Sequence, residues 1–182
     1  MIYLVGGSPR AGKSILGQQV AANLKIGWVS TDLLVELLRV NDESIKAEWN
    51  ATPEAITANA EWFFPYLERF VWGVVSHAEN YLIEGVGFLP TQVKRLSTQY
   101  QIRAVFLGRS KMTLENLDQF PGRSLGYSGL PEEARRQIAK DVPLWSEFIR
   151  QVSENFDYPY IDTGNDFYQQ LAQAESILTP SS

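Results

Sequence analysis

The sequence contains no cysteine and only one histidine, His77, among its 182 residues. The missing thiols exclude disulfide bonds, thiolate nucleophiles and cysteine-based metal sites. A single histidine also excludes a multi-histidine metal site. Any bound metal ion would therefore have oxygen ligands, which favours Mg²⁺.

Long apolar runs and a strong positive charge are also missing. The longest apolar stretches are only a few residues long, so we expect no membrane span. The net charge of −5 argues against a general nucleic-acid binder. The N-terminal residues predict a strand, not a signal peptide. With 45% hydrophobic and 20% charged residues, the composition is typical of one soluble domain over residues 1–182, and we expect a cytoplasmic protein.

The most informative stretch of the sequence is Gly7–Ser14, which follows a short apolar run at residues 2–5. It consists of GSPRAGKS and matches the G-x-x-x-x-G-K-[ST] pattern of a phosphate-binding loop, the Walker A motif. Glycines let consecutive backbone N–H groups turn towards one anion, and a helix that begins at the loop directs its positive dipole end to the same place. Apolar residues at 16, 20, 21 and 24 predict that helix. The alternative is a glycine-rich turn with a solvated lysine.

The residue types of this loop predict a nucleotide bound together with Mg²⁺. We expect Lys13 to contact the β- and γ-phosphates and the Ser14 hydroxyl to ligate Mg²⁺. The loop residues expected to bind the nucleotide are Gly7, Ser8, Pro9, Arg10, Ala11, Gly12, Lys13, Ser14 and Ile15.

Two acidic residues follow predicted strands and are candidates for the same site. Asp32 comes after the strand predicted at 26–30, where a carboxylate could accept a substrate hydroxyl proton or help to hold Mg²⁺ through water. Alternatively, Thr31 or Asp32 could simply be the N-cap of the next helix. Glu84 ends the apolar run 81–84, which resembles a Walker B element whose carboxylate orients a Mg²⁺-bound water. The candidate metal-binding residues are Ser14, Asp32 and Glu84.

The segment 40–80 is acidic and aromatic. Residues 32–84 contain ten acidic side chains and three basic ones. A helix is predicted to begin at Thr52 and to continue to Glu79, with a kink or break at Pro65. Most of its aromatic side chains are expected in the core, and the alternative is a helical cover over an acceptor site.

The segment 94–140 is basic, with nine basic side chains and four acidic ones. Turn-forming residues at 121–131 predict a loop between two helices, the second of which contains Pro143. Such a flap could close over a phosphate donor, exclude water and stabilise the transferring charge through an arginine. The candidate arginines are Arg123, Arg135 and Arg136, although each one alone could be a solvated helix residue.

A strand, a loop and a helix recur five times along the chain. This alternation predicts an α/β fold with three α/β/α layers, in which helices cover both faces of a five-stranded parallel sheet. The last predicted strand, 157–162, is followed by a loop that we expect near the nucleotide base. The residues of that loop are Thr163, Gly164 and Asn165.

The order of these elements and several segments resemble the P-loop small-molecule kinases of the adenylate-kinase-like branch. The segments are GGSPRAGKS, a strand that ends in STD, LIEGVGFLP and YPYIDTGNDF, with a basic helical hairpin before the last. This branch of the P-loop NTPases includes shikimate and gluconate kinases, zeta-toxin-like kinases and 2-phosphoglycerate-kinase-like proteins. The resemblance implies ATP or another NTP with Mg²⁺ at 7–14, an acceptor covered by a helical insertion at 40–80, and a helical lid at about 110–135.

The chain also departs from that pattern. Some relatives have an Asp-x-Asp where this sequence has Asp32 alone. The acceptor side offers only Arg39, Lys46 and Arg69 as basic residues, which speaks against a strongly anionic acceptor such as a nucleoside monophosphate.

The sequence therefore predicts an ATP-dependent phosphotransferase that moves the γ-phosphoryl group to a hydroxyl of a small molecule. In this hypothesis Lys13 and a lid arginine neutralise developing charge, and Asp32 activates the acceptor hydroxyl. One alternative is a nucleotide-binding NTPase or switch without a small-molecule acceptor. Another is a loop that binds a phosphate-containing ligand without turnover. We expect neither a nucleic-acid nor a membrane partner.

Overall fold

The computed structural model describes residues 1–40, 51–119, 127 and 129–179. Within them, five parallel strands form one sheet with the spatial order β2–β3–β1–β4–β5. The strands are β1 (Ile2–Gly7), β2 (Gly27–Ser30), β3 (Tyr81–Glu84), β4 (Ile102–Gly108) and β5 (Tyr160–Asp162). The predicted five-stranded parallel sheet is therefore confirmed.

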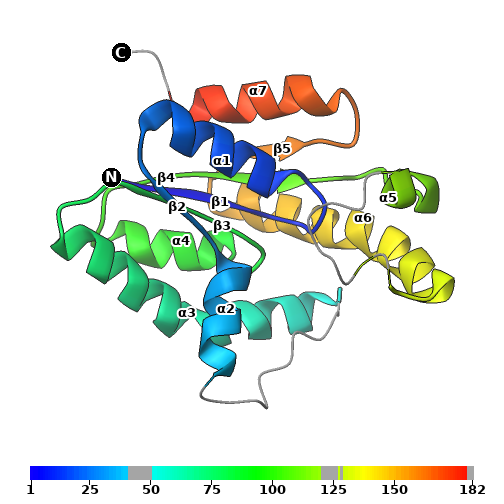
Figure 1. Cartoon of the computed structure of the whole chain (residues 1–182), viewed down its shortest axis with the longest axis horizontal. Coiled ribbons are helices and arrows are strands. Elements are labelled where there is room, and N and C mark those ends of the chain that lie inside the picture. The colour runs from blue at the N-terminus through cyan, green and yellow to red at the C-terminus, as the bar shows by residue number, and fades with distance from the viewer. Residues whose placement is uncertain (41–50, 120–126, 128, 180–182) are drawn as a thin grey trace.

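Helices cover both faces of the sheet, which confirms the predicted three-layer α/β/α arrangement (Figure 1). One face is covered by α1 (Lys13–Leu24) and α7 (Phe167–Leu178). The other is covered by α3 (Pro53–Ser76), α4 (Pro90–Ser97) and α6 (Glu132–Asn155). Two shorter helices, α2 (Thr31–Arg39) and α5 (Leu114–Gln119), follow β2 and β4.

The alternation of side chains along the strands divides the core into two halves. Leu4 of β1 packs among buried residues of α3, α4 and α6, whereas Val5 packs among those of α1 and α7. Successive side chains of a strand point to opposite faces, so a short apolar run supplies both halves. Both side chains are fully buried.

The helices predicted between the second and third strands and between the fourth and fifth strands are present. Between β2 and β3 the structure describes α2 and α3, and between β4 and β5 it describes α5 and α6. Residues 41–50, 120–126 and 128 of the expected insertion and lid lie outside the described residues. Among the helices that are described, none combines the length and hydrophobicity needed to cross a membrane.

The predicted break at Pro65 is not observed, because α3 runs through this proline as one helix, and α6 likewise runs through Pro143. A kink at Pro65 stays a prediction. Phe63, Phe64 and Leu67 are all buried around the first proline. Each such side chain contributes about 1.5–3 kcal/mol by burial. Together they outweigh the roughly 3 kcal/mol that a proline costs inside a helix.

Two local expectations for this half of the chain are wrong. The N-cap of α2 is Ser30, not Thr31 or Asp32, because the extended backbone of Ser30 lets its Oγ accept a hydrogen bond from Asp32 N at 3.3 Å. Of the aromatic residues expected in the core, Trp62, Tyr66 and Trp72 are each more than 40% exposed. These three lie on the side of α3 that faces away from the sheet.

Candidate active site

The Walker A segment forms the predicted loop between β1 and α1. Its glycines are required by close packing and by backbone conformation. A Cβ on Gly7 would lie 1.9 Å from the carbonyl oxygen of Leu107, and φ at Gly7 is +131°. At Gly12, φ is +93°, and a Cβ would lie 2.8 Å from the ring of Phe167. Any other residue at these two positions would displace the loop.

Lys13 begins α1, and its side chain lies buried inside the loop. Its ammonium group donates a hydrogen bond to the carbonyl oxygen of Ser8 at 2.6 Å. Burial lowers the pKa of Lys13, and the carboxylates of Glu84 and Asp32 act in the opposite direction. The positive charge is therefore held beside the loop and faces two acidic groups.

Glu84 ends β3, and the sheet order places it beside β1. It lies opposite Val5 of β1 and Ser30 of β2 in the strand registers. The Ser14 hydroxyl donates a hydrogen bond to Glu84 Oε1 at 2.9 Å. Burial raises the pKa of Glu84, while the charge of Lys13 and hydrogen bonds from serine side chains lower it. The structure thus joins the last residue of the Walker A motif to the predicted strand-end acid.

Asp32 lies in the first turn of α2, at the same edge of the sheet. Its charge acts on both Lys13 and Glu84, which shows that the three groups share one electrostatic environment. Among the described residues, the Asp32 carboxylate has no hydrogen-bond partner. It is therefore free to accept a proton or a hydrogen bond from a ligand.

The oxygen atoms at this edge suit a magnesium ion that is bound mainly through nucleotide phosphates. In the described part of the chain, no group of three or more histidine, cysteine, aspartate or glutamate residues could hold a metal by itself. Mg²⁺ in nucleotide sites needs only one or two protein oxygens, because phosphates and water complete its octahedron. Ser14 Oγ and Glu84 Oε1 lie close enough together to serve as such a pair, and the charge of Asp32 acts on the same carboxylate.

The loop after β5 supports the Walker A loop from the side of β4. Thr163 is buried, and its hydroxyl contacts the carbonyl oxygens of Ala11 at 3.1 Å and Gly108 at 3.0 Å. Gly164 N donates to Asp162 Oδ1 at 2.9 Å, and Asn165 Oδ1 accepts from Lys111 Nζ at 2.9 Å. The loop therefore lies against the phosphate-binding loop, and its contact with the nucleotide base stays a prediction.

Solved structures with the same arrangement of elements include several kinases. A shikimate kinase from Bacteroides thetaiotaomicron is similar over 98% of both chains, with a TM-score of 0.53 and 17% identity. A gluconokinase from Sinorhizobium meliloti is similar over 97% of this chain and 90% of its own, with a TM-score of 0.53 and 16% identity. An uncharacterized protein from Eubacterium ventriosum is similar over 100% and 99% of the two chains, with a TM-score of 0.55 and 13% identity. No protein-family model and no curated protein sequence matches this chain.

The fold is that of the P-loop small-molecule kinases. The resemblance inferred from the sequence is therefore confirmed at the level of the fold. In this kinase fold, Lys13, Ser14, Asp32 and Glu84 come from three different strand–helix junctions and converge at the carboxyl edge of the sheet.

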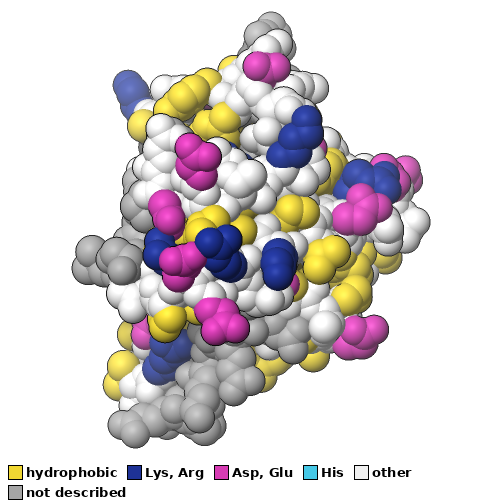
Figure 2. All heavy atoms as spheres, turned by 90° about the vertical axis from the view of Figure 1, so that its right-hand side faces the viewer, with side chains coloured by type: hydrophobic (Ala, Val, Ile, Leu, Met, Phe, Trp, Pro, Cys, Tyr) yellow, Lys and Arg dark blue, Asp and Glu magenta, His cyan; other side chains and the backbone are white. Residues whose placement is uncertain are grey.

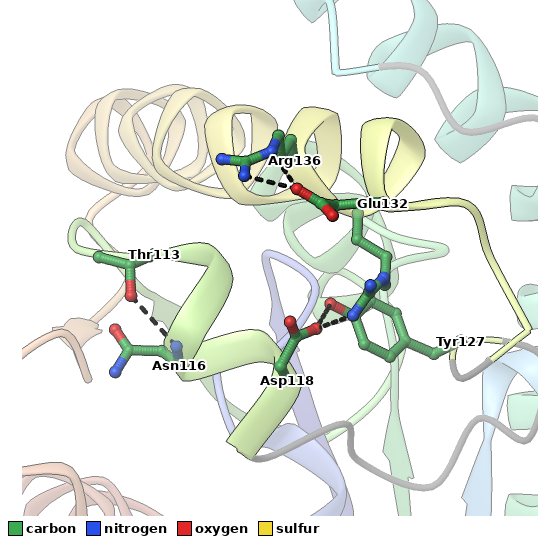
Figure 3. A network of polar contacts seen from close by, with 7 residues as sticks. Thr113, Asn116, Asp118, Tyr127, Glu132 and Arg136 are labelled. Atoms are coloured by element: carbon green, nitrogen blue, oxygen red, sulfur yellow. Dashed lines mark hydrogen bonds and ion pairs between the residues drawn. The ribbon is translucent and has the colours of Figure 1, made fainter.

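The predicted lid of the kinase fold is partly described, and one of its arginines is connected to the phosphate-binding loop. Arg135 forms an ion pair with Asp118, which also accepts a hydrogen bond from Tyr127 at 3.3 Å (Figure 3). The guanidinium of Arg10 lies over the Tyr127 ring, 4.5 Å from its centroid. Arg135 therefore belongs to a chain of contacts that ends on the loop.

The other two lid arginines have different surroundings. Arg136 pairs with Glu132 on the exposed side of α6, with Nε 2.8 Å from the carboxylate oxygen Oε1, and this pair is separate from Asp118 and Tyr127 (Figure 3). Arg123 lies outside the described residues. The face of the molecule that contains α5 shows basic and acidic side chains mixed together (Figure 2). In the described part of this face, acidic side chains lie between the basic ones, which therefore form no continuous positive surface.

Arg109 lies beside the loop, although it is not among the predicted site residues. Its Nη1 points to the carbonyl oxygen of Arg10 at 3.5 Å, and its guanidinium is 5.6 Å from the centroid of the Phe167 ring. Burial lowers the pKa of Arg109, and the charge of Asp162 acts against this effect. Its position directly after β4 was the available signal, since ligands bind at strand ends.

Proposed function

We propose that this chain is an ATP-dependent phosphotransferase that moves the γ-phosphoryl group to a hydroxyl of a small molecule. The observation that supports this most directly is the 2.9 Å hydrogen bond between Ser14 and Glu84, beside the buried ammonium of Lys13. A metal–phosphate site needs a hydroxyl, a carboxylate and a cation together. The likeness of the fold to kinases supports the same proposal.

In the proposed site, the loop binds the nucleotide phosphates, two side chains bind the metal ion, and one carboxylate acts as the base. The backbone N–H groups of the loop and Lys13 hold the phosphates of ATP or another NTP, as does the N-terminus of α1. Ser14 and Glu84 would hold Mg²⁺, with Asp32 in support through water, and a bound ion would supply charge neutralisation on the phosphates. The Asp32 carboxylate, which has no hydrogen-bond partner among the described residues, accepts the proton of the acceptor hydroxyl.

The acceptor in this proposal is a small molecule without strong negative charge. Arg39 on α2 is engaged by Glu36, and Arg69 on α3 lies over the Trp72 ring, 3.9 Å from its centroid. These are the basic residues of α2 and α3 within the described chain. An acceptor with several phosphate or carboxylate groups would need more guanidinium groups than these two helices offer.

The lid arginines complete the proposal. Arg135 is the stronger candidate for stabilising the transferring charge, because its contacts lead through Asp118 and Tyr127 to Arg10 of the loop. Arg136 and Arg123 stay candidates from the sequence alone. We propose a cytoplasmic location, where the nucleotide is available, and we propose neither nucleic acid nor membrane as a partner.

The test is to incubate the protein with ATP and Mg²⁺ and a panel of hydroxylated metabolites, and to measure ADP release and transfer of labelled γ-phosphate. We expect ADP release to depend on particular acceptors and to match the amount of phosphorylated acceptor. Lys13→Ala provides the control for contaminating activity. If ADP release is the same with every acceptor and without any acceptor, the result would instead support the NTPase or switch.

A further inference from the structure

One buried hydroxyl outside the predicted site holds the phosphate-binding loop. Ser146 lies in α6, is 1% exposed, and its Oγ has three hydrogen-bonding neighbours. It is 2.8 Å from Ser8 Oγ, accepts from Arg109 N at 2.8 Å and donates to Val142 O at 2.7 Å. A hydroxyl has one hydrogen and two lone pairs, so these partners use its whole capacity.

Two of these partners, Ser8 and Arg109, connect Ser146 to the phosphate-binding loop. Ser8 is fully buried, and its carbonyl oxygen accepts the hydrogen bond from the Lys13 ammonium at 2.6 Å. Its backbone N–H is bonded to Leu107 O at 2.9 Å, so Ser8 is held by the sheet as well as by Ser146. Arg109, the second partner, directs its side chain to the carbonyl oxygen of Arg10. Ser146 therefore contacts one residue of the loop and one residue that supports the loop.

We propose that Ser146 is a positioning residue for nucleotide binding, which it supports by holding Ser8 and so placing the carbonyl group that orients Lys13. This inference rests on the proposed binding of nucleotide phosphates at the loop. Removing the Ser146 hydroxyl leaves the buried Ser8 Oγ and the Arg109 N–H without this partner. The loop must then shift or open to water to satisfy them, and Lys13 loses its fixed position.

Ser146 also lies at a special place in α6. Pro143 has no N–H, so the carbonyl oxygen of Ala139 lacks its usual helical partner one turn earlier. Arg135 lies on the N-terminal side of this interruption, and Ser146 lies on the other. The proposed positioning residue thus ties the loop to the part of α6 that packs on the sheet rather than to the predicted lid.

The test measures binding of mant-ADP with Mg²⁺ to Ser146→Ala by fluorescence, together with the unfolding temperature. We expect about tenfold weaker binding, the size of effect that one lost buried hydrogen bond produces. Ser153→Ala is the matched control, because Ser153 is a fully buried serine on the same helix whose Oγ has no partner among the described residues. It should bind mant-ADP as the wild type does.

The double variant Ser8→Ala with Ser146→Ala distinguishes positioning from general destabilisation. If Ser146 acts through Ser8, its removal in the Ser8→Ala background weakens binding much less than tenfold. Ser146→Cys, which fills the same space with a weak hydrogen-bonding group, replaces Ser146→Ala if that variant does not fold. Binding equal to that of Ser153→Ala, or fully additive effects, would overturn the inference. A wild-type protein that does not bind mant-ADP would overturn the proposed function and with it this inference.

Discussion

Replacing Asp32 by asparagine tests the proposed chemistry with little change of shape. The carboxylate has no hydrogen-bond partner in the described chain, so the substitution breaks no observed side-chain hydrogen bond. The cap of α2 also stays, because Ser30 Oγ accepts from the backbone N–H of residue 32. What is lost is a negative charge in the first turn of a helix, which contributes about 0.3–1 kcal/mol to stability.

The expected loss of activity is much larger than this loss of stability. A positioned general base accelerates proton transfer by about 10²–10⁴-fold, so Asp32→Asn should lower kcat for the acceptor reaction by that factor. The Kd for mant-ADP with Mg²⁺ should change by less than about fivefold, because the Ser14–Glu84 pair and Lys13 remain. Steady-state kinetics with the best acceptor and fluorescence titration of mant-ADP measure these two quantities separately.

Glu54→Gln is a matched control for the helix-dipole contribution, since Glu54 lies in the first turn of α3. This variant should retain wild-type kcat. If Asp32→Asn weakens nucleotide binding as much as it lowers kcat, the base assignment is wrong and Asp32 is only a metal-supporting or structural residue.

Three further predictions concern the same site. Lys13→Ala should abolish ATP turnover while circular dichroism and the unfolding temperature show an intact fold, and normal turnover would refute the phosphate-loop assignment. Glu84→Gln should weaken Mg²⁺-dependent nucleotide binding at least tenfold. Because burial raises the pKa of Glu84, the native state binds its proton more tightly than the unfolded state, so wild-type stability should fall as pH rises from the unfolded to the native pKa. The Gln variant lacks this loss, so denaturant titrations should show that its stability relative to wild type rises over that window and then levels off. If the stability difference between the two proteins does not change with pH, the burial argument is wrong. Finally, uncharged acceptors should have a higher kcat/KM than carboxylates of the same size, for example sorbitol compared with gluconate, and the reverse order would contradict the account of Arg39 and Arg69.

Local sequence patterns predicted those parts of the structure that depend on neighbouring residues. The strand, loop and helix around Gly7–Ser14 follow from glycine conformations and an apolar run a few residues away. The helix start predicted at Thr52 is confirmed for the same reason, since Thr52 caps α3 and its Oγ1 accepts from Ala55 N at 3.3 Å. Pro65 shows the limit of local rules, because burial on both sides of it decided that the helix continues.

The sequence by itself determined the chemical groups of the site: a loop for phosphates, a lysine, a serine hydroxyl and two acids at strand ends. Only the tertiary structure decided which of these groups meet. The sheet order places β3 between β2 and β1, and therefore brings Glu84 within 2.9 Å of Ser14, 70 residues away. It also brings Ser146 of α6 to Ser8, although a serine in the middle of a helix has no distinguishing pattern. Contacts between distant segments depend on how whole layers pack, and no short stretch of sequence contains that information.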